Sequence, residues 1–100
     1  MYYRMTRLHW RPEDYDGVVS RAAALQSRIE SIQGLLFAEL IDTGEGEGMI
    51  IAAYRSEADY RTAADEVASI FDDLDEMLTA TPHGHEGTSV LSFGEAPGSD

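Results

Sequence analysis

The chain has 100 residues, enough for one domain with a modest hydrophobic core. It carries 19 Asp and Glu residues against 7 Arg and no Lys, which gives a formal net charge of -12, and it contains no cysteine. This charge repels phosphate backbones and anionic lipid, so we expect neither nucleic acid nor a membrane as a partner, and disulfide or thiolate chemistry is excluded. The N-terminus is too polar for a signal peptide and no apolar run reaches membrane-spanning length, so we expect a cytoplasmic protein.

The first predicted element is a strand over residues 2–10, YYRMTRLHW, which is rich in aromatic residues and alternates imperfectly. Pro12, Glu13 and Asp14 then predict the start of a helix, because proline suits the first turn and carboxylates complement the helix dipole. This helix is expected to end before Gly34, a typical C-terminal cap. The residues that form its single apolar face are Val18, Ala22, Leu25, Ile29 and Ile32.

Two apolar strands follow, at residues 35–41 and 49–54, joined by a turn at residues 42–48. The glycines of this turn lack the spacing of a phosphate-binding loop, no helix follows them, and the two glutamates among them would repel a phosphate. The sequence therefore predicts a flexible hairpin turn at this position.

A second helix is predicted from Ser56, which forms a capping-box-like start with Asp59, to a point before Pro82. Its acidic run at residues 72–76 lies on a helix, with no loop to wrap around a cation, and is interpreted as a solvated face. Residues 88–93, TSVLSF, predict the fourth strand. The main apolar stripe of the helix consists of Tyr60, Ala64, Val67, Phe71, Leu74 and Leu78.

The resulting order, βαββαβ, predicts a ferredoxin-like α+β domain over residues 1–95, with a flexible tail at residues 96–100. Its four-stranded sheet is antiparallel with both helices on one face, the first and third strands are central, and the fourth lies beside the first. The strands at 35–41 and 49–54 barely alternate, which indicates that both of their faces are covered. Since two helices cover only one face, we infer a homodimer packed sheet to sheet.

The element order, the length and the doubly apolar strands resemble the dimeric α+β barrel superfamily, and within it the antibiotic biosynthesis monooxygenase-like domains. The resemblance extends over about residues 1–95 and includes the first strand running into a proline-led helix, TRLHWRPEDYD. It implies a pocket between the sheet and the helices. The families that this chain resembles include cofactor-independent oxygenases of aromatic polyketides. Haem-degrading enzymes of similar fold use an Asn, Trp and His set. Because this chain contains no asparagine, we do not expect it to degrade haem.

A flat aromatic ligand would suit an aromatic pocket with a few polar atoms. Arg4 and Arg7 have opposite parity on the first strand, so one is expected to face the pocket and bind a phenolate or enolate oxygen, while the other pairs with a carboxylate across the dimer. Structural ion pairs for both arginines are the preferred interpretation, because buried charges are normally paired. The expected pocket-lining residues are Tyr3, Arg4, Phe37, Tyr60 and Phe71. The candidate catalytic residues, as base and anion-stabilising groups, are His9, Arg7, Tyr54 and Trp10.

The stretch TPHGHEG, residues 81–87, holds two of the three histidines. On the predicted sheet, His83, His85 and Glu86 lie near His9, and two or three imidazoles with a carboxylate suit zinc or another divalent transition metal. A pH-sensitive cluster without metal is a second interpretation. Because Gly84 and Gly87 flank the pair, a polar turn of solvated histidines remains the preferred interpretation.

We therefore expect a homodimer that resembles cofactor-independent monooxygenases and that oxidises or binds a small aromatic or hydrophobic molecule without a cofactor. Two alternatives remain open. One is a non-catalytic ligand-binding or regulatory dimer, and the other is a metal-binding protein that uses the histidine cluster.

Overall fold

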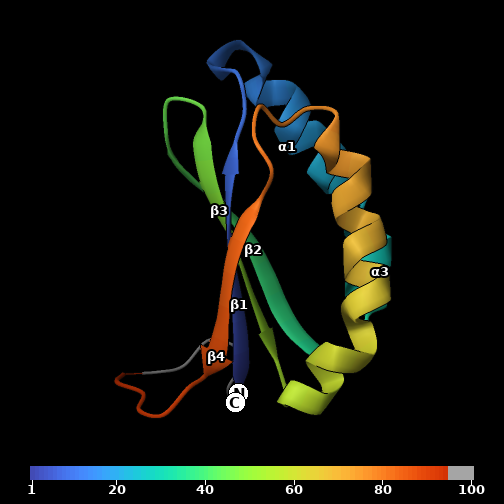
Figure 1. Cartoon of the computed structure of the whole chain (residues 1–100), viewed down its shortest axis with the longest axis vertical. Coiled ribbons are helices and arrows are strands. Elements are labelled where there is room, and N and C mark those ends of the chain that lie inside the picture. Colours follow the sequence, from blue (N-terminus) through green and yellow to red (C-terminus); the bar gives the residue numbers. More distant parts are fainter. Residues whose placement is uncertain (95–100) are drawn as a thin grey trace.

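The computed structural model describes residues 1–94 and folds them into two layers, a twisted sheet and a layer of helices (Figure 1). This arrangement confirms the predicted ferredoxin-like α+β fold. The predicted tail at residues 96–100 lies outside the described residues. The elements are β1 (Tyr2–His9), the 3-10 turn η1 (Pro12–Asp14), α1 (Tyr15–Ala24), α2 (Gln26–Glu30), β2 (Leu35–Gly44), β3 (Glu47–Tyr54), α3 (Glu57–Asp75) and β4 (His83–Thr88).

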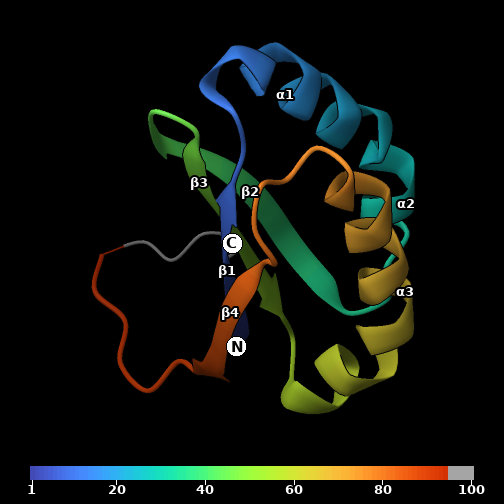
Figure 2. The same ribbon diagram turned by 45° about the horizontal axis from the view of Figure 1, so that its top comes forward.

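The sheet has the strand order β2-β3-β1-β4, and all of its neighbouring strands are antiparallel. β1 and β3 are central and β2 and β4 form the edges, as the sequence predicted. Figure 2 shows that the helices lie over one face of this sheet and leave the other face uncovered. No helix within residues 1–94 has the length and apolar character needed to cross a membrane.

The fourth strand lies five residues earlier than predicted. It spans His83–Thr88, so the stretch interpreted as a polar turn is strand, whereas Val90, Leu91 and Phe93 of the predicted strand are exposed. Gly84 explains part of this difference, because a Cβ at this position would lie 2.6 Å from the guanidinium carbon of Arg4. The glycine that looked like a turn residue makes room for a side chain of the neighbouring strand.

The first helix is also divided, which the sequence did not predict. The chain bends at Leu25, between α1 and α2, where the backbone has φ -92° and ψ 2°. Leu25 is buried in the core at the bend. Tertiary packing therefore overrides the continuous helical pattern of the sequence here.

α3 begins as expected, since the Ser56 hydroxyl accepts a hydrogen bond of 3.1 Å from the backbone N–H of Asp59. A turn between β2 and β3 is confirmed, with positive φ at Gly44, Glu45 and Gly46, but it is shorter than the predicted 42–48 because the strands extend to Gly44 and from Glu47. The acidic run 72–76 is exposed at its four carboxylates, which agrees with a solvated face.

Candidate functional site

A cavity of about 740 Å³ lies between the sheet and the helices. Most of its wall is apolar and comes from α1, α2, α3 and the helix-facing side chains of the strands. The polar residues of the wall are Arg4, Thr6, Gln26, Glu30, Glu39 and Asp42, and the aromatic ones are Trp10, Tyr15, Phe37, Tyr54 and Phe71. A concave, mostly apolar space with a few polar groups is typical of a small-molecule site.

Trp10 follows the end of β1, where its backbone N–H donates a 2.8 Å hydrogen bond to the carbonyl of Gly46. Its indole ring packs on β3 at Gly48, where an added Cβ would lie 2.8 Å from Cζ3 of the ring and still closer to Cη2. Because residue 48 is a glycine, the indole ring can lie directly against β3. On the helix side, the ring centroid of Tyr15 is 6.5 Å from that of Trp10.

Two polar atoms of the cavity residues are buried without a partner. Trp10 is 4% exposed and Thr6 is 2% exposed, and both side chains belong to the helix-facing row of β1. Within residues 1–94, neither Trp10 Nε1 nor Thr6 Oγ1 has a hydrogen-bond partner. Most buried polar groups in proteins are paired, so the absence of a partner for these two atoms needs an explanation, such as a ligand that binds there.

Tyr54 adds a third polar group at the end of β3. Its side chain is 2% exposed, and its ring lies edge-on to that of Tyr60 at a centroid distance of 5.2 Å. Burial raises the pKa of the Tyr54 hydroxyl above its ordinary value, and the neighbouring Tyr60 adds to this effect. The hydroxyl therefore stays protonated near neutral pH and can donate a hydrogen bond, but it is a poor base.

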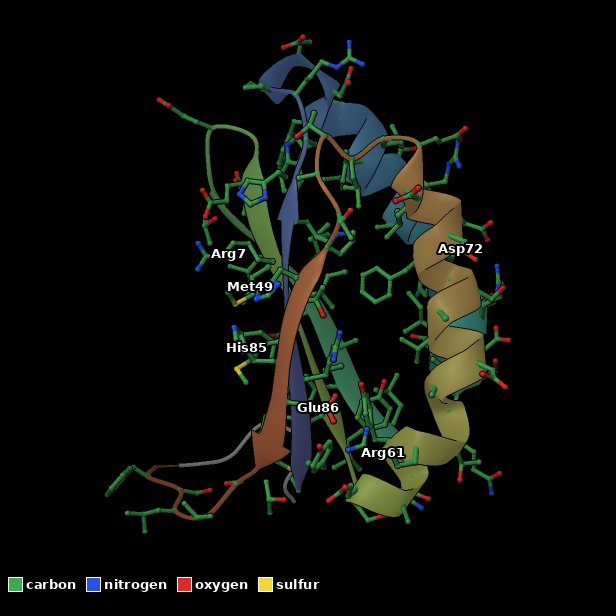
Figure 3. The ribbon with its side chains drawn as sticks, in the orientation of Figure 1. Arg7, Met49, Arg61, Asp72, His85 and Glu86 are labelled. Carbon is green, nitrogen blue, oxygen red and sulfur yellow. The ribbon has the colours of Figure 1, made fainter. Side chains whose placement is uncertain are left out.

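A carboxylate network adjoins the cavity around Glu86 of β4. The hydroxyls of Tyr2 and Tyr60 each donate a 2.8 Å hydrogen bond to it, and Arg4 Nη1 and Arg61 Nη2 lie 3.0 Å and 2.8 Å from its oxygens. Donation from Tyr60 and Tyr2, together with the charge of Arg61, lowers the pKa of Glu86 to about 2. Figure 3 shows Glu86 and Arg61 on the helix side of the sheet.

This network holds Arg4 in place. Its Nη1 also donates a 3.2 Å hydrogen bond to the Tyr60 hydroxyl, and the guanidinium lies over Gly84. Arg4 belongs to the cavity wall and is the only arginine among the residues that form it within the described chain. Its side chain is 30% exposed, so it can reach a ligand while remaining paired.

The predicted pocket and catalytic residues divide between the two faces of the sheet. Arg4, Trp10, Tyr54 and Phe71 belong to the cavity wall, and Tyr60 adjoins it through Arg4. Phe37 also borders the cavity, but its ring packs against Tyr3, with centroids 6.4 Å apart. Tyr3, Arg7 and His9 belong to the row of β1 that faces away from the helices. Figure 3 shows Arg7 on that side.

The histidines do not gather as expected. The register places His85 opposite Met5 and His83 opposite Arg7, so His9 lies beyond the end of β4. His9 Nε2 is instead 4.0 Å from Glu47 Oε2. Glu86 points to the helix side, opposite to His85 (Figure 3). Within residues 1–94, no group of three His, Cys, Asp or Glu residues is arranged to hold a metal.

Sequence reasoning missed three contributors to this site: Thr6, Tyr2 and Arg61. Thr6 and Tyr2 share parity with Arg4 on β1, and that signal would have placed them on the helix-facing row. Arg61 gave no such signal, because its contact with Glu86 depends on how α3 crosses the sheet. Glu86 was recognised only as a candidate metal ligand together with the histidines.

No protein-family model and no curated protein matches this sequence. Solved structures do match its fold. A monooxygenase from Streptomyces coelicolor, in complex with the ligand nanaomycin D, has a TM-score of 0.79 at 19% identity and covers 95% of this chain and 92% of its own. A protein of unknown function from Nitrosomonas europaea has a TM-score of 0.77 at 13% identity and covers 95% and 94%.

An antibiotic biosynthesis monooxygenase matches with a TM-score of 0.72 at 15% identity, over 91% of this chain and all of its own. At these identities the similarity shows the fold alone. It confirms the structural resemblance that the order of elements predicted.

Proposed function

We propose that this chain binds a small, flat aromatic molecule with an oxygen substituent in the cavity between the sheet and the helices. The observation that carries the proposal is the pair of unpartnered buried atoms, Trp10 Nε1 and Thr6 Oγ1, on residues of a mostly apolar wall. Each unsatisfied buried group costs about 1–3 kcal/mol. A carbonyl or phenolic oxygen of a ligand would supply the missing partner for the indole N–H after a small shift of the ring, because Nε1 is closed to solvent in the ligand-free structure.

The other residues of the wall suit the same ligand. Phe71 and Tyr15 supply aromatic surface, and Arg4 supplies a positive charge for an anionic oxygen. The Tyr54 hydroxyl, whose raised pKa keeps it protonated, supplies a further donor. These groups favour a phenol, quinol or quinone over a wholly apolar molecule.

Oxygenation without a cofactor is the chemistry that the fold similarity to a monooxygenase supports. For a simple phenol such as 1-naphthol, the reaction consumes one O₂ and gives 1,4-naphthoquinone and water. The phenolic hydrogen and the ring hydrogen leave with one oxygen atom as water, and the other oxygen atom enters the ring. Arg4 and Trp10 would stabilise the phenolate that must form before it reacts with O₂. His9 and Arg7 lie on the other face and have no part in this proposal.

The cavity-bearing chain is also proposed to be a homodimer through the uncovered face of the sheet. That face carries half-buried apolar side chains, whereas a face in contact with water would carry polar ones. The apolar members are Tyr3, Met5, Phe37, Met49 and Ile51. Light scattering on the protein as it elutes from a size-exclusion column should give twice the mass of the chain. The Ile51→Glu variant should give the mass of one chain.

The binding proposal is tested by calorimetric titration with 1,4-naphthoquinone. Quinones react with the side chains of cysteine and lysine, and this chain contains neither. We expect one molecule to bind per chain. Ala22→Phe places a ring in the cavity from α1 and should abolish binding. Ala24→Phe, exposed on the same helix and outside the cavity wall, is the matched control and should bind as the wild type does.

An oxygen electrode then separates binding from catalysis. Consumption of one O₂ per 1-naphthol, abolished in Ala22→Phe, is the result expected of a monooxygenase. Binding without oxygen uptake would establish the ligand-binding alternative. Binding that persists unchanged in Ala22→Phe would place the ligand elsewhere and refute the site.

A further inference from the structure

His83 and His85 form a side-chain pair that the cavity does not use. They occupy alternate positions of β4, so both imidazoles lie on the face away from the helices, and both side chains are exposed. Their ring centroids are 5.1 Å apart, with the planes at 81°. Within residues 1–94, neither ring has a hydrogen bond or a carboxylate partner.

This separation suits a shared metal ion. Two imidazoles bound to one metal at about 2.0–2.1 Å, with a roughly tetrahedral angle between them, have centroids about 5 Å apart. An edge strand also presents both rings from one side without any change of backbone. The spacing of the two rings is therefore compatible with chelation of one ion.

The neighbouring strand supplies a soft third ligand. Met5 is directly opposite His85 in the register of β1 and β4, and its side chain is half-buried on the same face. Directly opposed residues have Cβ atoms about 4.5–5.5 Å apart, which lets a methionine thioether reach the imidazole. Thioether sulfur selects monovalent copper among the biological metals, and imidazole also binds copper.

The other charged groups of this face do not complete a site for a hard cation. Glu47 forms an ion pair with Arg7, with 3.2 Å between Oε1 and Nη1. Its other oxygen, Oε2, is 4.0 Å from His9 Nε2. Glu86 points to the opposite face. Arg7, opposite His83, is paired with Glu47 and so repels a cation less than a free guanidinium would. The net charge of -12 attracts cations to the chain as a whole.

We propose that His83, His85 and Met5 bind one monovalent copper ion on the face of the sheet away from the helices, which is also the face through which the homodimer is proposed to form. This site replaces the predicted set of His9, His83, His85 and Glu86, and it requires no carboxylate. It lies on the opposite side of the sheet from the cavity, so it is independent of the proposed ligand.

The test is an anaerobic titration of the whole protein with Cu(I), in competition with the chromophoric chelator bathocuproine disulfonate. We expect one Cu(I) per chain. His83→Asn and His85→Asn should each weaken binding by about tenfold or more, a loss of about 1.4 kcal/mol or more. Met5→Leu keeps the size of the side chain and should also weaken binding. Copper K-edge absorption should show a sulfur neighbour in the wild type that Met5→Leu lacks.

The same face provides matched controls. His9→Asn and Met49→Leu remove a histidine and a methionine that lie outside the proposed ligand set, and both should leave copper binding unchanged. Failure of the protein to compete for Cu(I) would overturn the proposal. Equal losses in His9→Asn and His85→Asn, or a wild-type spectrum without sulfur, would also overturn it.

Discussion

Replacing Thr6 by valine should stabilise the ligand-free protein, although it deletes a polar group from a buried position. The hydroxyl has no hydrogen-bond partner and the side chain is 2% exposed, so its desolvation is uncompensated. Valine has nearly the same shape and keeps the β-branched form that suits the central strand. Removing an unsatisfied group should raise the free energy of unfolding by about 1–3 kcal/mol.

Urea unfolding monitored by circular dichroism measures this change. For a domain of this size, each 1 kcal/mol corresponds to a rise in Tm of about 4–8 °C. Thr62→Val is the control, since the Thr62 hydroxyl is exposed on α3 and donates a 3.0 Å hydrogen bond to the carbonyl of Ala58. That change should stay within about 0.5 kcal/mol of the wild type. A Thr6→Val protein less stable than the wild type by 1 kcal/mol or more would mean that the hydroxyl is already satisfied, and the reasoning would fail.

Two further predictions concern the indole and the carboxylate network. Gly48→Ala should destabilise the protein by about 1–3 kcal/mol in urea, because its methyl group overlaps the Trp10 ring; Gly87→Ala, with open space around it, should be closer to neutral, and equal effects would contradict the packing argument. The pKa of Glu86 is about 2 in the fold against an ordinary 4.5, so its contribution to stability is complete above pH 4.5 and is lost as the pH falls towards 2. Glu86→Gln should therefore be less stable at neutral pH and lose less stability over that acid range, and urea midpoints that fall as steeply as in the wild type would contradict this.

The order of the predicted strands and helices was sufficient to predict most of the fold. The aromatic first strand and the apolar third strand pair over their whole lengths, and parity alone placed Arg4 and Arg7 on opposite faces. The same parity would have put Thr6 beside Arg4 in the helix-facing row. These results follow because side-chain direction in a strand depends only on position.

The fourth strand was misplaced because local propensity and pairing disagree. TSVLSF has the residues that favour strands, whereas HGHEGT has two glycines and looks like a turn. The native pairing is decided by contacts that are remote in sequence: Gly84 leaves space for the Arg4 guanidinium, and Glu86 accepts hydrogen bonds from Tyr2 and Tyr60. None of these contacts can be derived from the segment itself.

The histidine cluster was misjudged for the same reason. A strand that starts at position 88 brings His85 close to His9, but the actual register moves His85 opposite Met5. A shift of five residues changes both the neighbours and the ligand set. The proposed ligands are accordingly two imidazoles and a thioether, in place of the predicted imidazoles and carboxylate.

The central claim is that the buried indole N–H of Trp10 serves a ligand oxygen in the cavity. Trp10 is the only tryptophan of the chain, so its Nε1–H gives a single indole signal in a ¹H–¹⁵N correlation spectrum. Titration with 1,4-naphthoquinone should move this signal downfield as a hydrogen bond forms, and the movement should saturate together with the calorimetric binding curve. A ligand that binds while the indole proton shows no downfield shift would contradict the account.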